Sequence, residues 1–446
     1  MRVVTTIKNI WKIEDLRKRI ITTLSYVAIY LFGTYVVIPG VDPKALTGLA
    51  SQTQGGLMAL LDMFSGGAFS NASLFAMGIM PYISASIVMQ LVTILIPSFQ
   101  KMQREGESGR RKINQMTRYL TVAILVLQGF AYLTNLDYQM HGVGSALPSG
   151  LWYRVSSIII MAAGSMFVLW LGERITDKGI GNGISFIIMI GIINRLPRSL
   201  MQEFTSRMNE QAGGLVMFLL ELLLLLFVIA GAIALVQGTR KVPVQYAKRI
   251  VGNKQYGGAR QYIPLKVNAA NVMPIIFAQA ILMIPVSIIS MSKGGNVGSF
   301  IQSFMNASGF WYNFTFAVMI IAFTYFYTAI TINPTQMADD LKRNNGFIPG
   351  IKPGKATKEY LDAIMDRITL PGAFFLAIVA ILPAFARMAG VSQGFSQFFG
   401  GTSLLILVGV VLDTLQQVES HLLMRHYDGL LKSGRIKGRT GAAASY

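Results

Sequence analysis

Long apolar runs separated by short polar connections dominate the pattern along this chain. A helix needs about 17 to 25 apolar residues to cross the ~30 Å hydrocarbon core of a bilayer, and ten windows of that kind occur. They lie near residues 20–38, 73–96, 118–136, 152–171, 183–202, 214–236, 271–290, 311–332, 371–389 and 402–420. The pattern therefore predicts ten transmembrane helices and an all-α integral membrane protein.

Composition supports a membrane protein and narrows its chemistry. Of the 446 residues, 53% are hydrophobic and 13% are charged, which is too apolar for a soluble domain of this length. Cysteine is absent and three histidines occur, so disulfides and Cys/His metal sites are excluded or nearly so. We expect no metal and no other cofactor.

The basic residues are distributed unevenly between the connections. When alternate connections are assigned to one side, that side holds 32 of the 39 Lys and Arg residues. Because positively charged connections stay in the cytoplasm, both termini are expected there. Residues 1–19 then form an N-terminal cytoplasmic amphipathic segment, and residues 421–446 form a basic cytoplasmic tail.

Two cytoplasmic connections, residues 237–268 and 333–369, are longer than a link between helices needs. They carry seven and six basic residues. The positive-inside bias with attraction to anionic lipid explains such charge. A docking surface for an acidic or phosphate-rich partner, such as ribosomal RNA, explains it as well. The loops alone leave both interpretations open.

Ten spans divide into a first half, residues 20–202, and a second half, residues 203–420. Five spans per half give the second half an inverted topology if the halves are related. Inverted repeats place the working site between the halves, near the midplane of the membrane. Similarity between the halves is not evident residue by residue, so this expectation rests on topology.

One stretch is apolar enough for a bilayer but is broken. Between Leu60 and Pro81, the segments Ser65-Gly66-Gly67 and Ser70-Asn71-Ala72-Ser73 interrupt it. Irregular backbone is excluded from lipid, but it is tolerated where it lines a water-filled cavity. The pattern predicts a piece of two or three turns before the second span. An ordinary external loop packed on the bundle remains the alternative.

Candidate chemistry within the spans is sparse. Glu221 and Asp413 are the obvious acids, and we expect interior or interfacial acids with polar partners, not a proton relay. The segment KGIGNGIS, Lys178 to Ser185, lacks the Lys-Ser/Thr of a phosphate-binding loop and predicts a tight turn.

Two other functions can be set against a channel. A secondary transporter of a small solute is the alternative, and it would need a polar site between the halves. An intramembrane hydrolase would need a nucleophile with a base, or paired acids. No such constellation is evident in the sequence, so we expect no enzymatic activity.

Five longer motifs carry a resemblance to a known family. They are FSGGAFSNASLFAMGIMPYISASIVMQL, DKGIGNGISFIIMIGI, YIPLKVNAANVMPIIFAQAILMIP, GFIPGIKPGKAT followed by RITLPGAF, and FGGTSLLILVGVVLDTLQQVES. In their order and intervals the chain closely resembles the SecY subunits of bacterial preprotein translocases, over essentially its whole length. The resemblance implies a protein-conducting channel of the bacterial inner membrane, with two inverted five-helix halves around a central hourglass pore. Such a channel passes unfolded preproteins across the membrane and releases transmembrane segments sideways into lipid.

The resemblance also implies roles for individual residues. A plug helix is expected at about residues 60–71, with Leu61, Phe64, Ser65, Gly66, Gly67, Phe69 and Asn71. The implied pore ring consists of Ile79, Ile83, Ile188, Ile276 and Ile406. Stiff apolar side chains at a constriction hold back water and ions by dewetting, and Ile79 and Ile83, four residues apart, would share one helix face. The implied lateral gate is lined by Ser84, Gln90, Gln128, Asn271 and Ile284.

The partners implied by the resemblance are small membrane subunits of the SecE and SecG type, the SecA motor ATPase, the ribosome with its rRNA, signal peptides and preproteins, and the lipid bilayer. Arg249 in YAKR corresponds to the basic tip of the loop between the sixth and seventh spans. Lys352 in GIKPG stands where many family members have arginine. Lysine keeps the charge but loses the planar bidentate fork of arginine, so we expect both residues to dock partners, with altered contacts at Lys352.

Overall fold

The computed structural model describes residues 11, 13–41, 62, 64–141, 148, 150–209, 214–246, 249–251, 254–256, 260–279, 281–282 and 309–432. The expected plug residue Leu61 and the expected gate residue Ile284 lie outside these ranges.

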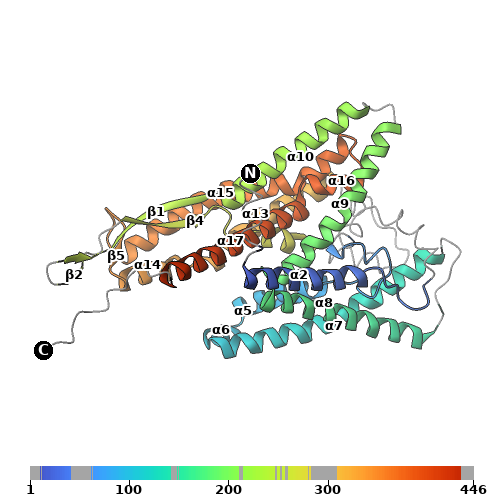
Figure 1. The fold of residues 1–446 in the computed structure, drawn as a ribbon, viewed down its shortest axis with the longest axis horizontal. Helices are drawn as coiled ribbons and strands as arrows, with labels where there is room; N and C mark the ends of the chain where they lie inside the picture. Colours follow the sequence, from blue (N-terminus) through green and yellow to red (C-terminus); the bar gives the residue numbers. More distant parts are fainter. Residues whose placement is uncertain are drawn as a thin grey trace.

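Helices make up most of the described chain (Figure 1). The first group comprises α2 (Glu14–Gly33), α5 (Met80–Leu95), α6 (Pro97–Arg104), α7 (Glu107–His141), α8 (Leu151–Lys178) and α9 (Gly183–Asn209). The second comprises α10 (Gly214–Gln237), α13 (Phe310–Thr331), α14 (Pro334–Arg343), α15 (Lys355–Met388), α16 (Gln393–Ser396), the 3₁₀ turn η1 (Gln397–Phe399) and α17 (Gly401–Lys432). Residues 273–279 are also helical and are called the seventh-span helix below.

Seven of the described helices are long and apolar enough to cross a membrane. The pair α5 and α6, bent by 104° at their junction, would raise the number to eight. Helix α2 is not among them, since Arg17, Lys18 and Arg19 occupy its first turns and leave a short apolar part. The chain is thus a multi-pass membrane protein, and the count of ten spans stays a prediction.

The second span begins later than its apolar window predicts. Residues 65–79 form successive turns, and α5 begins at Met80 with Pro81 in its first turn. Proline suits this position because its φ is preset and its missing N–H would have no helical partner there. Gly78, just before the helix, has φ +53°, a conformation that glycine adopts without steric cost.

The connection at residues 237–268 contains strands, so the prediction of an all-α protein is wrong for this part. Strand β1 (Thr239–Tyr246) pairs antiparallel with β4 (Arg260–Lys266), and β5 (Gly346–Phe347) adds to the other edge of β1. A separate hairpin joins β2 (Arg249–Val251) to β3 (Lys254–Tyr256). Figure 1 shows the three-stranded sheet and α14 at one end of the molecule, toward which α6 also lies.

The three-stranded sheet is stabilised by its own small core. Val242 and Val244 of β1 and Leu265 of β4 are buried with Leu341 of α14 and Leu361 of α15. Side chains two apart share one face of a strand, which explains why Val242 and Val244 are both buried while their neighbours along β1 are exposed or half-buried. The core ties the two long basic loops together into one unit.

Apolar clusters divide the helices into two groups that share a third cluster. One cluster joins α7 and α8 to residues 69–77, and another lies among α10, α13, α15, α17 and the seventh-span helix. The shared cluster brings Phe64, Ile188 and Ile192 against Phe395 and Ile406. Figure 1 shows α9 running between the two groups. The boundary expected between residues 202 and 203 stays a prediction.

A buried ionic cluster also links α9 to the second group. Arg207 of α9 pairs with Glu203 at 3.0 Å and with Glu221 of α10 at 2.5 Å. It also donates to the Gly390 carbonyl at 2.7 Å, and Glu203 accepts the Ser392 backbone N–H at 2.8 Å. The expectation that Glu221 is an interior acid with a polar partner is confirmed.

We expect Arg207→Leu to lower the thermal unfolding midpoint of the detergent-purified protein. The substitution leaves two buried carboxylates without their cation, and breaking a buried ion pair in this way costs about 3–5 kcal/mol. Arg111→Leu is the matched control, because it removes an exposed pair with Glu107 and should change the midpoint little. Equal shifts in the two variants would contradict a stabilising role for the buried cluster.

Candidate functional site: an apolar constriction and the segment behind it

The centre of the bundle holds an apolar cavity to which both helix groups contribute. It has a volume of about 30 Å³ and is lined by Phe64, Met80, Ile83, Ser84, Ile87, Ile188, Ile276, Gln279 and Ile406. Its isoleucines come from α5, α9, the seventh-span helix and α17. The structure therefore brings four of the five expected ring residues together with one plug residue and one gate residue.

A second and larger cavity lies beside three of these isoleucines. It has a volume of about 330 Å³ and shares Ile188, Ile276 and Ile406 with the first cavity. Its lining also includes Lys266 at the end of β4 and Asp413 of α17, so it lies toward the end of the molecule that carries the sheet. The shared isoleucines thus stand between two cavities, as the side chains of a constriction do.

Ile79 lines neither of these cavities. It is 4% exposed and packs in a neighbouring cluster with Val27, Tyr30 and Phe75. Ile79 is the N-cap residue of α5, and its carbonyl accepts the Ile83 N–H at 3.1 Å, so the two isoleucines lie one turn apart, and both contact this cluster. Ile79 therefore lies beside the constriction, whereas Ile83 borders both the cavity and the cluster.

The four described gate residues lie in different places. Ser84 lines the central cavity. Gln90 and Gln128 are half-buried on α5 and α7, two helices that pack together. Asn271 is exposed, has φ +51° and lines the larger cavity. The Asn268 side chain donates to the Asn271 carbonyl at 3.1 Å.

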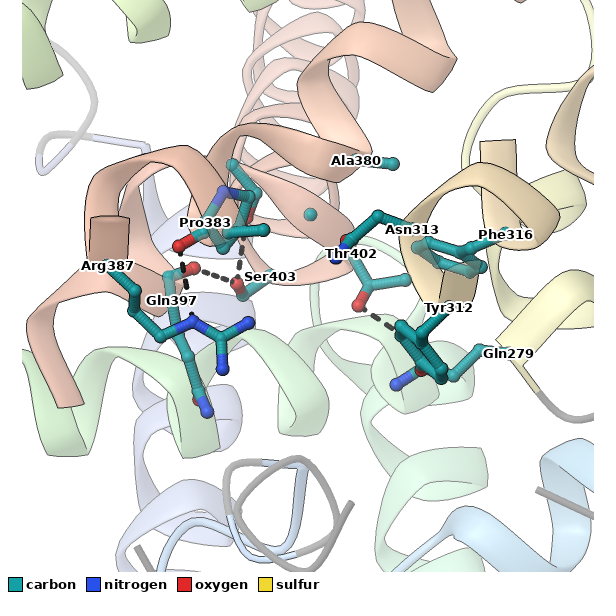
Figure 2. Close-up of a pocket in the computed structure, with 13 residues that line it drawn as sticks. Gln279, Tyr312, Asn313, Phe316, Ala380, Pro383, Arg387, Gln397, Thr402 and Ser403 are labelled. Carbon is teal, nitrogen blue, oxygen red and sulfur yellow. Dashed lines mark hydrogen bonds between the residues drawn. The ribbon is translucent and has the colours of Figure 1, made fainter. Parts of the chain in front are cut away.

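Sequence reasoning missed Gln279, which lies one turn beyond Ile276 on the seventh-span helix. Gln279 is 5% exposed, and the Thr402 hydroxyl donates to its Oε1 at 3.2 Å. It lines both the central cavity and a more polar pocket of about 70 Å³ among α13, α15, η1 and α17 (Figure 2). A lone amide in the apolar run IIFAQAIL was the signal that could have found it, since a buried polar side chain needs a partner.

The segment behind the constriction has irregular backbone. A plug helix was expected over residues 60–71. Of the described residues in that range, Asp62 and Phe64 are helical and residues 65–71 are turns, which continue to Ala72. Gly66 and Gly67 have φ +67° and +95°, a region that favours glycine. Gly66 also approaches Gly191 of α9 so closely that a Cβ on Gly66 would lie 3.0 Å from the Gly191 Cα. The segment therefore packs backbone to backbone on the helix that supplies Ile188.

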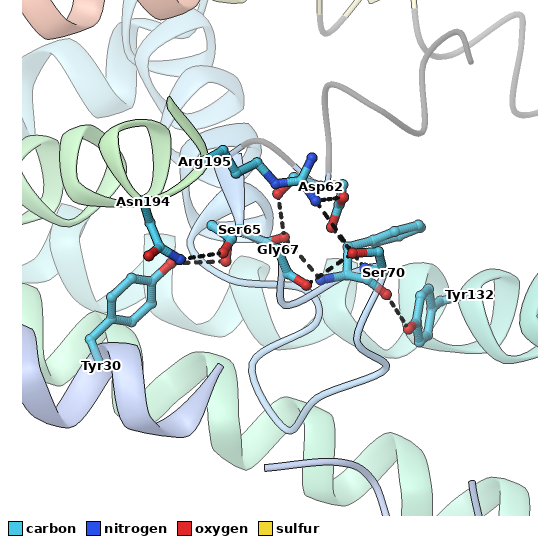
Figure 3. Close-up of polar contacts among 10 residues, drawn as sticks. Tyr30, Asp62, Ser65, Gly67, Ser70, Tyr132, Asn194 and Arg195 are labelled. Carbon is cyan, nitrogen blue, oxygen red and sulfur yellow. Dashed lines mark hydrogen bonds and ion pairs between the residues drawn. The ribbon is translucent and has the colours of Figure 1, made fainter. Parts of the chain in front are cut away.

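Polar side chains from three helices bind this segment through its backbone carbonyls (Figure 3). Tyr30 of α2 donates to Ser65 at 3.1 Å, Tyr132 of α7 to Phe69 at 2.8 Å, and Asn194 of α9 to Gly66 at 3.2 Å. Buried carbonyls need partners, and a segment without a regular helix must find them elsewhere. These three side chains supply partners for carbonyls of the turns.

Asp62 organises the same segment from within. Its carboxylate forms an ion pair with Arg195 of α9 and accepts the Ser70 backbone N–H at 2.7 Å, while its carbonyl accepts the Gly67 N–H at 2.9 Å (Figure 3). Arg195 also donates to the Ser70 hydroxyl at 3.3 Å. Sequence reasoning missed this pair because its two members are far apart in the chain.

The two expected docking residues lie in the connections that form the sheets. Arg249 begins β2. Lys352 is exposed in the turn between β5 and α15, where Gly350 and Gly354 have φ +84° and +99°. The Thr357 hydroxyl donates to the Lys352 carbonyl at 2.9 Å, which fixes the backbone and leaves the lysine side chain at the surface.

Comparison with known proteins gives consistent matches along the chain. A family model described as SecY matches residues 73–415. The protein translocase subunit SecY of Streptomyces galbus is 41% identical over 440 residues, which cover 96% of this chain and 100% of the relative.

Two solved structures share the fold. One is a SecY protein whose plug domain stabilises the closed state of the translocation channel and maintains a membrane seal; it matches with a TM-score of 0.61 at 17% identity, over 91% of this chain and 92% of that chain. The other is Sec61 in the canine ribosome–channel complex from the endoplasmic reticulum, with a TM-score of 0.56 at 15% identity and the same coverage.

We expect Asp62→Asn to loosen the turns at residues 64–72. The substitution keeps the shape of the side chain but removes the charge that pairs with Arg195, and a hydrogen bond to a charged group contributes about 1.5–3 kcal/mol. Amide hydrogen exchange of Ser70 and its neighbours should rise about tenfold or more, since 1.4 kcal/mol is a factor of ten. Asp137→Asn, which removes a more exposed pair with Arg154, is the control. Unchanged exchange in Asp62→Asn would show that the pair does not hold the segment.

Proposed function

The chain belongs to the SecY family, and from this premise we propose that it forms the pore of a protein translocation channel. The pore passes unfolded preproteins across the membrane and releases transmembrane segments sideways into lipid. SecY proteins are channel subunits and not enzymes. The observation that carries the proposal is the convergence of Ile83, Ile188, Ile276 and Ile406 on one cavity, with Phe64 of the irregular segment against them.

An isoleucine constriction suits a cargo that contains every kind of side chain. Branched apolar side chains block water and ions by dewetting and offer a passing chain no hydrogen bonds that would retain it. A segment that reaches lipid sideways is then sorted by its own hydrophobicity. Leu or Ile contributes a few tenths of a kcal/mol toward insertion, and Asp, Lys or Arg opposes it by about 2.5–3.5 kcal/mol at the membrane centre.

A secondary transporter remains the rival from another class, and the central cavity argues against it. Such a transporter needs a compact polar site with coupling-ion ligands near the midplane. The described lining of the central cavity is mostly isoleucine, with Ser84 and Gln279 as its polar side chains. This lining suits a seal better than a solute site.

The finer architecture is part of the proposal. It consists of ten spans in two inverted halves, residues 20–202 and 203–420, around an hourglass pore. The segment at residues 60–71 acts as the plug, and Ser84, Gln90, Gln128, Asn271 and Ile284 line the lateral gate between the halves. Ile79 closes the ring of isoleucines from beside the cavity. The contact of Phe64 with the constriction and the match to a channel with a plug domain support these assignments.

The partners follow from the same premise. Small subunits of the SecE and SecG type surround the pore, and SecA or a ribosome docks on the basic cytoplasmic loops through Arg249 and Lys352. Both termini lie in the cytoplasm of a bacterial cell, and the pore lies in the inner membrane. Two observations support cytoplasmic docking: the long basic loops share one folded core, and the related fold of Sec61 occurs in a ribosome–channel complex.

Replacing Ile83 or Ile276 with glycine should raise the resting ion conductance of the reconstituted channel several-fold, because each substitution widens and wets the constriction. The measurement is single-channel recording in planar bilayers. Ile159→Gly is the matched control, since Ile159 lies on α8 and is 61% exposed. A resting conductance that stays at the wild-type level in both ring variants would overturn the constriction.

Deleting residues 60–71 should also make the resting channel conduct ions, because the proposed plug and its contacts with α2, α7 and α9 are lost. The same bilayer recording tests this, with translocation of a preprotein as a second readout. A solute transporter would lose its activity on such a deletion without becoming leaky. A tight, inactive variant would therefore favour the rival function.

A further inference from the structure

We propose that the hydrogen bond between Gln279 and Thr402 is a latch that holds the constriction closed. The inference rests on the proposed channel function and adds two positioning residues to it. Neither side chain belongs to the isoleucine ring. Each lies one helical turn from a ring residue on a different helix, and the two meet at 3.2 Å.

The geometry couples the bond to the ring. Gln279 follows Ile276 by three residues on the seventh-span helix, and Thr402 precedes Ile406 by four residues on α17. Residues three or four apart lie on the same side of a helix, and Gln279, Ile276 and Ile406 line the same cavity. The bond therefore fastens the two helices together directly beside the pair of isoleucines that they contribute.

The two sides of the latch differ in how firmly they are held. Thr402 lies at the beginning of α17, where Gly400 packs so closely on α15 that a Cβ would lie 2.2 Å from the Val379 carbonyl oxygen. Gly401 has φ +67°, and the Ser403 hydroxyl donates back to the Gly400 carbonyl at 3.2 Å. The Thr402 hydroxyl thus projects from a fixed platform. The bond restrains the seventh-span helix against that platform.

The environment makes this bond both effective and reversible. Gln279 and Thr402 are each 5% exposed, so neither can exchange its partner for bulk solvent in the closed state. The polar pocket beside them is lined by Tyr312, Asn313 and Gln397 (Figure 2). Once the helices separate, these groups and water can form replacement hydrogen bonds with the Gln279 amide and the Thr402 hydroxyl. A neutral bond with such replacements favours the closed form about fivefold, which corresponds to about 1 kcal/mol.

Buried amides also act simply as glue between membrane helices, so the test must separate gating from stability. Thr402→Val keeps the size of the side chain and removes the hydroxyl, Gln279→Leu removes the amide, and Thr402→Ser retains the hydroxyl. Thr324→Val is the matched control, because the buried Thr324 hydroxyl of α13 donates to its own helix, at the Ile320 carbonyl.

Two readouts report on the constriction itself. The first is resting conductance of the reconstituted channel complex in planar bilayers. The second uses Ile87→Cys, which places a thiol in the central cavity of a chain that has no natural cysteine. A membrane-impermeant thiol reagent is applied from the side opposite the sheet, because α5 runs from Ile83 through Ile87 toward α6 and the sheet end. Its reaction rate then measures passage through the ring. The thermal midpoint of each variant is recorded as well.

We expect Thr402→Val and Gln279→Leu each to raise the conductance and the thiol reaction rate about fivefold. The double variant should show no more than the larger single effect, since one bond is lost in all three. Thr402→Ser and Thr324→Val should behave like the wild type.

Three results would overturn the latch: a lower thermal midpoint with unchanged conductance and thiol rate, an equal effect of Thr402→Ser and Thr402→Val, or additive effects in the double variant. Ile83→Gly separates this failure from failure of the channel. If Ile83→Gly leaks while Thr402→Val does not, the latch alone is wrong. If neither leaks, the constriction and the latch are both wrong.

Discussion

The irregular backbone at residues 65–79 can lie within a membrane bundle because its polar groups find partners inside the protein. Lipid offers no hydrogen bonds, and each unpaired N–H or C=O there costs several kcal/mol. Part of the solution is a short strand-like contact, in which Ile38 N–H bonds to the Ala72 carbonyl and Leu74 N–H to the Val36 carbonyl. Turn hydrogen bonds within the segment satisfy other groups, and Asp62 and side chains of α2, α7 and α9 supply further partners.

That constraint arranges the helices around the segment. The side chains of Tyr30, Tyr132 and Asn194 can donate to carbonyls of the segment only if α2, α7 and α9 surround the turns. The contact between Gly66 and Gly191 sets the depth at which the segment rests on α9, and Phe64 then meets the isoleucines from α5, α9, the seventh-span helix and α17. A segment that must satisfy its backbone internally therefore ends up at the meeting point of the two helix groups.

The sequence predicted what depends on local pattern and missed what depends on distant partners. Apolar windows located the long helices from α7 to α17, because a run of apolar residues over one membrane thickness has few other uses. The beginning of α5 was missed, since whether residues 73–79 continue a helix depends on their tertiary partners. Arg195 and Asp62 lie 133 residues apart, and the residues next to each in the sequence do not indicate that the two form an ion pair.

The strands of the basic loop were missed for a different reason. Val242 and Val244, and likewise Ile263 and Leu265, are apolar residues two apart, which is a period-two signal for a strand. The positive charge of the loop was enough to identify a cytoplasmic connection, so the interpretation of the loop did not use this signal. Four ring isoleucines were placed through the family resemblance, because a single isoleucine in an apolar helix carries no signal that separates a constriction from ordinary packing.

In the proposed channel, the polar contacts around the constriction are few and individually modest, which bears on how the channel opens. Hydrogen bonds between membrane helices contribute on average about 0.6 kcal/mol each, with a maximum of about 1.7. At that average, three carbonyl contacts, one bond between helices and one ion pair together contribute about 3 kcal/mol. A cargo segment of about twenty apolar residues that gains a few tenths of a kcal/mol per residue in lipid supplies about 6 kcal/mol. The proposed closed state, built from weak polar contacts around an apolar constriction, is thus within reach of the free energy that an apolar cargo segment provides.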